Sequence, residues 1–194
     1  MSAVLDAPPD LDLPDHYEVV NGVIVENEPM SGYASEIANR LNSKLTVYAE
    51  AHKNGRSRMD MLFRVPVPHD PTRQREPDVA FISYERWPEA RPLPYSGAPV
   101  DVVPDLVVEV ASPSNLADEL LLKGLDYLRA GARLVWLIYP LSQHIYAYTH
   151  VNERPRLFTE TDIMDAGDVL PEFSVPVSAL FPPVRDLPPP TDDE

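Results

Sequence analysis

The sequence contains no cysteine. Disulfide bonds, thiolate nucleophiles and cysteine-ligated zinc are therefore excluded, and any metal ion must be held by oxygen or imidazole ligands. The five histidines are scattered without an HExxH spacing, so a histidine-bound zinc site is not expected. Only seven residues are glycine, and neither a GxSxG elbow nor a glycine-rich phosphate loop is present. Serine-hydrolase and nucleotide-kinase chemistry thus lose their main support.

Long apolar runs are also absent. None approaches the roughly 18 residues that span a bilayer, and the first ten residues lack the basic start and apolar core of a signal peptide. We therefore expect a soluble, cytoplasmic protein without a membrane partner. Its 194 residues, 44% of them hydrophobic, suit a single domain. We place that domain at 16–181, between a flexible acidic and proline-containing tail (1–15) and a proline-rich acidic tail (182–194).

Positive charge is scarce, because 16 Lys and Arg oppose 31 Asp and Glu for a formal net charge of -15. This balance opposes binding of nucleic acid through the molecule as a whole. The segment 53–75 differs, with six basic residues against two acidic ones. Such segregation favours directional recognition of an anion, and a solvated basic hairpin explains it equally well. Five arginines of this segment are candidate nucleic-acid contacts: Arg56, Arg58, Arg64, Arg73 and Arg75.

Apolar periodicity and turn residues predict the secondary structure. Two helices are expected, one over 34–51 and one that starts at a cap formed by 113–115 and stops at Gly131. The other expected elements are a hairpin over 17–26 turning at Asn21-Gly22, strands at 58–67, 77–83, 104–111, 132–139 and 144–149, an irregular loop over 84–103, and short strands within 155–181 lying over the sheet. This order predicts an α/β (α+β) fold with a mixed central sheet flanked by helices and an N-terminal β-hairpin.

Glu109 interrupts a run of Val and Leu that is typical of a buried strand. An ionised group there is costly unless a cation or a hydrogen-bond network receives it, so it is a functional-site candidate. Strand periodicity places Asp105, Val107 and Glu109 on one face. A structural pairing with arginine is the alternative for Glu109, and a turn or capping role is the alternative for Asp105.

Asp78 enters a neighbouring apolar run in the stretch EPDVAFI. If the two strands pair, the carboxylates of Asp78 and Glu109 converge, which is how proteins commonly hold Mg²⁺. An ordinary strand-start residue after Pro77 is the alternative for Asp78. Lys123 lies at the margin of the apolar face of the second helix, where its ammonium could reach the sheet. Spacing alone favours its pairing with Glu119 instead.

Five stretches, in this order along residues 16–181, resemble the Uma-two family of bacterial endonucleases. They are VENEPM (25–30), EPDVAFI (76–82), DLVVEVASPS (105–114), Lys123 with DYLRAGARLVWLI (126–138), and VLPEF (169–173) with Leu180-Phe181. That family belongs to the PD-(D/E)XK superfamily and has the restriction-endonuclease-like fold. The resemblance implies a magnesium-dependent phosphodiesterase in which Mn²⁺ is also possible.

The resemblance also implies roles for individual residues. Asp78 would be the aspartate of the PD element, Glu109 the second metal-binding carboxylate, and Glu26 a further metal ligand. The superfamily lysine usually lies two residues after the second acid, where this chain has Ala111. Its function would then fall to Lys123, whose charge could stabilise the transition state or lower the pKa of the attacking water. Family members commonly carry a histidine where this chain has Ala34.

These observations give a first hypothesis and two alternatives. The first is a metal-dependent nuclease that acts on nucleic acid, DNA rather than RNA, as a homodimer. The alternative is a catalytically silent dimeric binding or regulatory module with the same fold, which the negative charge and Ala34 favour. A third possibility is an acid/base hydrolase that uses Glu109 and Asp78 on a sugar.

Overall fold

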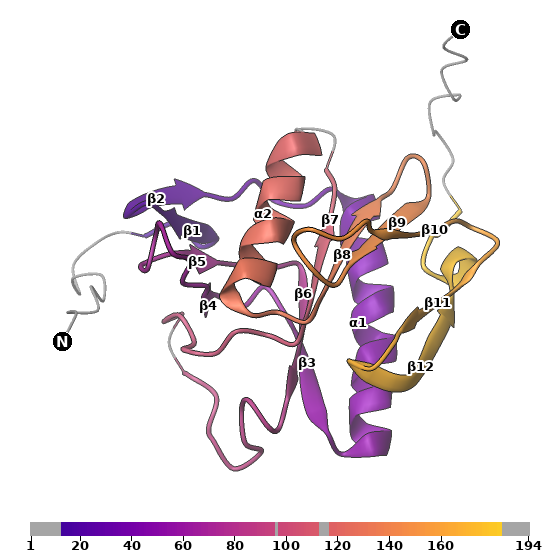
Figure 1. Ribbon diagram of the computed structural model, residues 1–194, viewed down its shortest axis with the longest axis horizontal. Helices are drawn as coiled ribbons and strands as arrows, with labels where there is room; N and C mark the ends of the chain where they lie inside the picture. Colours follow the sequence, from indigo (N-terminus) through magenta and orange to yellow (C-terminus); the bar gives the residue numbers. More distant parts are fainter. Residues whose placement is uncertain (1–12, 96, 113–116, 184–194) are drawn as a thin grey trace, which may run out of the picture.

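A six-stranded mixed sheet forms the centre of the protein, and one helix covers each of its faces (Figure 1). The computed structural model describes residues 13–95, 97–112 and 117–183. The strand order is β10 (Arg156–Phe158), β9 (His144–Tyr148), β8 (Leu134–Tyr139), β7 (Leu106–Val110), β6 (Val79–Ser83) and β3 (Gly55–Met59). The predicted mixed sheet is thereby confirmed. β7 and β8 are its parallel pair, and the helix that connects them carries Lys123.

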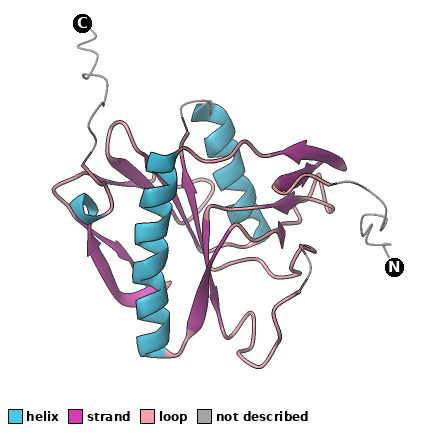
Figure 2. Cartoon of the chain, turned by 180° about the vertical axis from the view of Figure 1, so that it is seen from behind, coloured by secondary structure: helices cyan, strands magenta, loops and turns pink. Residues whose placement is uncertain are grey.

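The first face is covered by α1 (Gly32–His52), seen in front of the sheet in Figure 2. Its N-terminus is capped by Ser31, whose Oγ accepts the N–H of Ala34 at 3.2 Å. Ile37, Leu41 and Leu45 recur at helical spacing and are fully buried against the sheet. β11 (Ile163–Ala166) and β12 (Leu170–Pro176), followed by the 3-10 turn Val177–Ala179, join the same core, so the C-terminal strands do lie over the sheet.

The second face is covered by α2 (Ala117–Ala130). The helix ends as predicted at Gly131, which has φ +111. The N–H of Gly131 donates to the carbonyl of Leu128 at 3.1 Å, and the N–H of Ala132 donates to the carbonyl of Tyr127 at 2.9 Å. This pair of bonds is a Schellman motif, which satisfies carbonyls that the helix end leaves free. The predicted cap at 113–115 lies outside the described residues.

A second, four-stranded sheet carries the N-terminal hairpin to the side of α2. Its order is β2 (Val23–Glu26), β1 (Tyr17–Val20), β5 (Gln74–Arg75) and β4 (Phe63–Arg64). Asn21 and Gly22 have φ of 52° and 75°, the positive values of a type I′ turn, which confirms the predicted hairpin. None of the described helices is long and apolar enough to cross a membrane.

The uninterrupted strand expected over 58–67 is wrong. β3 ends at Met59 and pairs in the central sheet, whereas β4 begins at Phe63 and pairs in the smaller one. Asp60 between them has φ 47°, a left-handed conformation that Asp tolerates better than most residues. Trp87, in the loop over 84–103, and Trp136, on β8, are both buried, at 1% and 0% exposed.

Gly55→Ala is expected to lower the free energy of unfolding by about 1–3 kcal/mol. A Cβ at this position would lie 2.5 Å from Phe81 Cζ and 2.6 Å from the backbone oxygen of Ile82. The backbone contact cannot be relieved by side-chain rotation, so β3 and β6 would have to separate. Urea unfolding beside Gly32→Ala, whose Cβ meets nothing within 4 Å, measures the effect. Equal stability of the two variants would contradict the prediction.

Candidate active site

The structure brings Asp78 and Glu109 together on neighbouring antiparallel strands. Val79 of β6 pairs with Val108 of β7, so Asp78 lies beside the end of β7 that carries Glu109. Asp78 Oδ2 accepts the N–H of Val110 at 2.6 Å. This bond fixes the Asp78 carboxylate next to the Glu109 strand.

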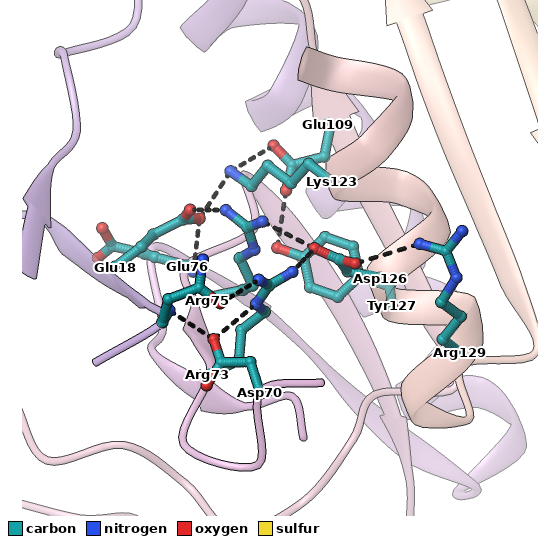
Figure 3. A network of polar contacts seen from close by, with 11 residues as sticks. Glu18, Asp70, Arg73, Arg75, Glu76, Glu109, Lys123, Asp126, Tyr127 and Arg129 are labelled. Atoms are coloured by element: carbon teal, nitrogen blue, oxygen red, sulfur yellow. Dashed lines mark hydrogen bonds and ion pairs between the residues drawn. The ribbon is translucent and has the colours of Figure 1, made fainter. Parts of the chain in front are cut away.

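Glu109 is only 3% exposed, and residues of α2 engage both of its carboxylate oxygens. Oε2 lies 2.9 Å from Lys123 Nζ, and Oε1 accepts the hydroxyl of Tyr127 at 2.8 Å. Figure 3 shows Lys123 and Tyr127 reaching Glu109 from the same helix. The cation that receives this buried acid is therefore a lysine and not an arginine.

Lys123 joins two glutamates. Its Nζ lies 2.8 Å from Glu18 Oε1 as well as 2.9 Å from Glu109 Oε2. The pairing with Glu119 that helical spacing favoured is wrong, because the Lys123 ammonium points from α2 toward the sheets (Figure 3). The side chain of Lys123 is 19% exposed, which places its charge at the edge of the interior.

Glu18 is a member of this group that the sequence analysis missed. It lies on β1, is 4% exposed, and pairs with Arg75 at 2.5 Å. Its Oε1 also accepts the N–H of Glu76 at 3.1 Å. The signal that could have identified it is the one that identified Glu109, an acid within an apolar strand.

The other acids of the sequence analysis lie elsewhere. Glu26, which the resemblance gave as a metal ligand, is exposed at the end of β2, opposite Tyr17. Asp105 is 3% exposed and accepts the N–H of Ser83 at 2.8 Å. The structure thus gives Asp105 the capping role that was its alternative.

Two of the five candidate nucleic-acid contacts point into the protein. Arg73 pairs with Asp70 at 3.0 Å and with Asp126, and Arg75 pairs with Asp126 at 2.9 Å and with Glu18 (Figure 3). The side chains of Arg73 and Arg75 are 6% and 12% exposed. We therefore correct the expectation for these two residues, whose guanidinium groups are committed to carboxylates.

The remaining three candidates are half-buried on β3 and β4. Arg56 lies over the rings of Tyr84 and Trp87, at 5.2 Å and 5.1 Å from their centroids. Arg58 follows two residues later on the same strand, and Arg64 lies on β4. The expectation of phosphate contact stays with Arg56, Arg58 and Arg64.

The carboxyl groups of the site differ in their pKa values. Burial raises the pKa of Asp78 to about 6. Burial, together with the negative charges of Asp78 and Glu18, raises the pKa of Glu109 to about 8. Lys123 opposes both shifts. Burial also acts to raise the pKa of Glu18, but the positive charges of Lys123 and Arg75 outweigh burial, so the pKa of Glu18 lies below its ordinary value. In the metal-free site, ionisation of Asp78 and Glu109 is therefore unfavourable, and a bound cation would offset that cost.

The free energy of unfolding of the metal-free protein is expected to fall from pH 5 to pH 8. The ordinary pKa values are 3.8 for Asp78 and 4.5 for Glu109, against about 6 and about 8 in the folded protein. Between these limits the folded protein keeps protons that the unfolded chain has released, so stability drops as pH rises. The slope is up to about 1.4 kcal/mol per pH unit for each carboxyl.

Urea unfolding in EDTA from pH 5 to pH 8 measures this dependence. Glu109→Gln is expected to flatten the curve above pH 6, where Asp78 has largely ionised in the folded protein. Stability that rises steadily over this range in the wild-type protein would contradict the arrangement of the site.

The site suits a divalent cation. With every carboxyl ionised, as metal binding requires, five carboxylates (Glu18, Asp70, Asp78, Glu109 and Asp126) face three cations (Arg73, Arg75 and Lys123) in the connected network with Asp78, a surplus of two negative charges. The more exposed Arg129 is not counted. Mg²⁺ is commonly held by one or two carboxylates and several waters. Within the described ranges no three His, Asp or Glu side chains form a metal-ion cluster, so the donor set that fits is the pair Asp78 and Glu109.

Comparison with known proteins identifies the family of this chain. The profile of the Uma2 family, described as "Putative restriction endonuclease", matches residues 7–178. The chain belongs to the Uma2 family. This confirms the family that the sequence motifs predicted. None of the curated proteins matches this Uma2 chain.

A solved structure shares the fold of this Uma2 protein. It is that of "a putative nuclease belonging to DUF820" from Anabaena variabilis ATCC 29413, which has 19% sequence identity and a TM-score of 0.72. The match covers 85% of this chain and 89% of that chain. The predicted restriction-endonuclease-like fold is confirmed by this likeness.

Proposed function

We propose that the protein is a Mg²⁺-dependent nuclease that hydrolyses phosphodiester bonds of nucleic acid, with DNA as the preferred substrate and Mn²⁺ as a substitute ion. The observation that carries the proposal is the meeting of Asp78, Glu109 and Lys123 at the end of β7. Membership of the Uma2 family and the likeness to the "putative nuclease" from Anabaena variabilis support the same activity. A sugar hydrolase gains no such support.

Asp78 and Glu109 would hold the metal ion, which when bound neutralises phosphate charge and acidifies its water. Asp78 is fixed through Oδ2 by the N–H of Val110. Its Oδ1 would then be the oxygen that binds the ion. Glu109 offers Oε2, the oxygen that Lys123 contacts at 2.9 Å.

Lys123 would stabilise the negative charge that develops on the phosphoryl group. Burial disfavours its charge, but Glu109, Glu18 and Asp78 raise its pKa above the ordinary value, so the amine stays protonated at neutral pH. A positioned cation at a developing charge contributes more in a site shielded from water than in bulk water. Arg56, Arg58 and Arg64 would contact the phosphate backbone outside this centre.

The first test is cleavage of supercoiled plasmid, single-stranded DNA and RNA by the purified protein in Mg²⁺, Mn²⁺ or EDTA. Lys123→Ala is expected to slow cleavage by about 10²–10³-fold, as loss of one transition-state contact does. Glu119→Ala, an exposed acid one turn earlier on α2, is the matched control and should retain activity. Equal rates for wild type, Lys123→Ala and Glu109→Ala would refute the proposal.

A catalytically silent binding or regulatory module is the second candidate. The specific observation in its favour is that both oxygens of Glu109 are already engaged, by Lys123 and Tyr127. This alternative predicts nucleic-acid binding that neither needs Mg²⁺ nor leads to cleavage. Homodimer formation and a cytoplasmic location stay predictions, which sedimentation and cell fractionation can test.

A further inference from the structure

Tyr127 is a buried tyrosine whose hydroxyl points at the candidate metal-binding carboxylate. Its side chain is 0% exposed and packs in the apolar core between α2 and the sheet. Its carbonyl accepts the N–H of Ala132 in the motif that ends α2, so the backbone at this position is fixed as well. The hydroxyl therefore has little freedom, and it lies 2.8 Å from Glu109 Oε1.

Glu109 is held at two points that are one helical turn apart. Tyr127 follows Lys123 by four residues, which places both side chains on the same face of α2. Tyr127 binds Oε1 and Lys123 contacts Oε2, so together they set the rotation of the carboxylate plane. Without the hydroxyl, Oε1 would lie in the interior without a donor, and the carboxylate would rotate to find one.

Glu18 has an equivalent second anchor. It shares Lys123 with Glu109, and it is held independently by Arg75. Arg75 is in turn fixed by Asp126 at 2.9 Å. Lys123, Asp126 and Tyr127 thus make α2 the element that orients both glutamates (Figure 3).

We infer that Tyr127 is a positioning residue of the site, which aims Glu109 Oε2 at the metal ion through its hydrogen bond to Oε1. The inference rests on the proposed function. Partners that orient a metal ligand typically account for about 10–100-fold in metal affinity or activity. Tyr127→Phe removes the hydroxyl and keeps the ring that fills the core.

The chain offers a matched control in Tyr48 of α1. Tyr48 is 8% exposed and its hydroxyl donates to the carbonyl of Pro171 at 2.9 Å, in the core on the opposite face of the sheet. The same hydroxyl accepts the side-chain N–H of Asn54 at 3.3 Å, so Tyr48→Phe removes two part-buried hydrogen bonds, both outside the site. Both variants are expected to lower the midpoint of thermal unfolding by about 2–4 °C.

The experiment measures Mn²⁺ binding by calorimetry and plasmid cleavage for wild type, Tyr127→Phe and Tyr48→Phe. Tyr127→Phe is expected to raise the Mn²⁺ dissociation constant about 10-fold or more and to lower kcat, with KM for DNA unchanged. Tyr48→Phe should match the wild-type protein in its Mn²⁺ dissociation constant, its kcat and its KM for DNA. If the wild-type protein is active and Tyr127→Phe binds Mn²⁺ and cleaves DNA equally well, the inference about Tyr127 is wrong while the proposed function stands. The same holds if Tyr127→Phe and Tyr48→Phe lose Mn²⁺ affinity and kcat to the same extent. A wild type that neither binds Mn²⁺ nor cleaves would overturn the proposed function, and the inference with it.

Discussion

Glu109→Gln is expected to reduce Mg²⁺-stimulated cleavage by about 10³-fold or more, while the free energy of unfolding at pH 7 changes by less than about 1 kcal/mol. Glutamine keeps the shape and can still accept the Tyr127 hydrogen bond, but it lacks the negative charge that a metal ion requires. Because the pKa of Glu109 is about 8 in the folded protein, the neutral amide resembles the protonated carboxyl that it replaces at pH 7. Activity is measured by plasmid nicking and stability by urea unfolding.

Glu26→Gln tests whether Glu26 is a metal ligand, as the sequence motifs suggest, or lies outside the site, as the structure suggests. Motif resemblance suggested Glu26 as a third metal ligand, whereas the structure places it exposed at the end of β2 and places Glu18 beside Lys123. We expect Glu26→Gln to cleave at the wild-type rate. Loss of activity comparable to that of Glu109→Gln would restore Glu26 to the site.

Arg73→Met is expected to lower the free energy of unfolding by about 3–5 kcal/mol. The substitution fills similar volume but leaves Asp70 and Asp126, which are 3% and 4% exposed, without the cation that joins them. Removing one partner of a buried ion pair leaves a charge that the interior cannot solvate. Equilibrium unfolding in urea at pH 7 gives the value directly.

Arg129→Met is the matched control, because Arg129 contacts the same Asp126 from a side chain that is 38% exposed. An exposed pair of this kind contributes less than about 1 kcal/mol. If both variants lose the same stability, the buried network does not hold these elements together. If Arg73→Met instead weakens nucleic-acid binding and leaves stability intact, Arg73 contacts phosphate as the sequence suggested.

The main elements of the fold could be predicted because each leaves a local signal. The Asn21-Gly22 turn demands positive φ at two residues, and Gly131 supplies the left-handed end of α2. Glu109 stood out for a similar reason, since a lone acid among Val and Leu residues needs a partner. The structure supplies that partner in Lys123.

Partners across long sequence separations could not be predicted. Glu18 and Arg75 are 57 positions apart, and Arg73 and Asp126 are 53 apart. A local pattern can show that a side chain faces the interior, but it does not show which distant charge it meets there. For this reason Arg73 and Arg75 resembled surface cations, and Lys123 was assigned to its near neighbour Glu119.

The break at Asp60 has a related origin. The sequence from Arg58 to Val67 carries no glycine to mark a left-handed residue, and an aspartate tolerates that conformation without requiring it. Here the requirement is the passage of the chain from the central sheet to the smaller one. That passage depends on how the N-terminal hairpin pairs with β5, which is a tertiary property.

The most direct test of a two-carboxylate metal site is an anomalous difference map from crystals of the protein soaked in Mn²⁺. We expect one strong peak bonded to Asp78 and Glu109, with the ammonium of Lys123 displaced from Glu109 Oε2 or shared with a ligand of the ion. A map without a peak at these carboxylates, in which Lys123 still joins Glu18 to Glu109 at saturating Mn²⁺, would contradict it.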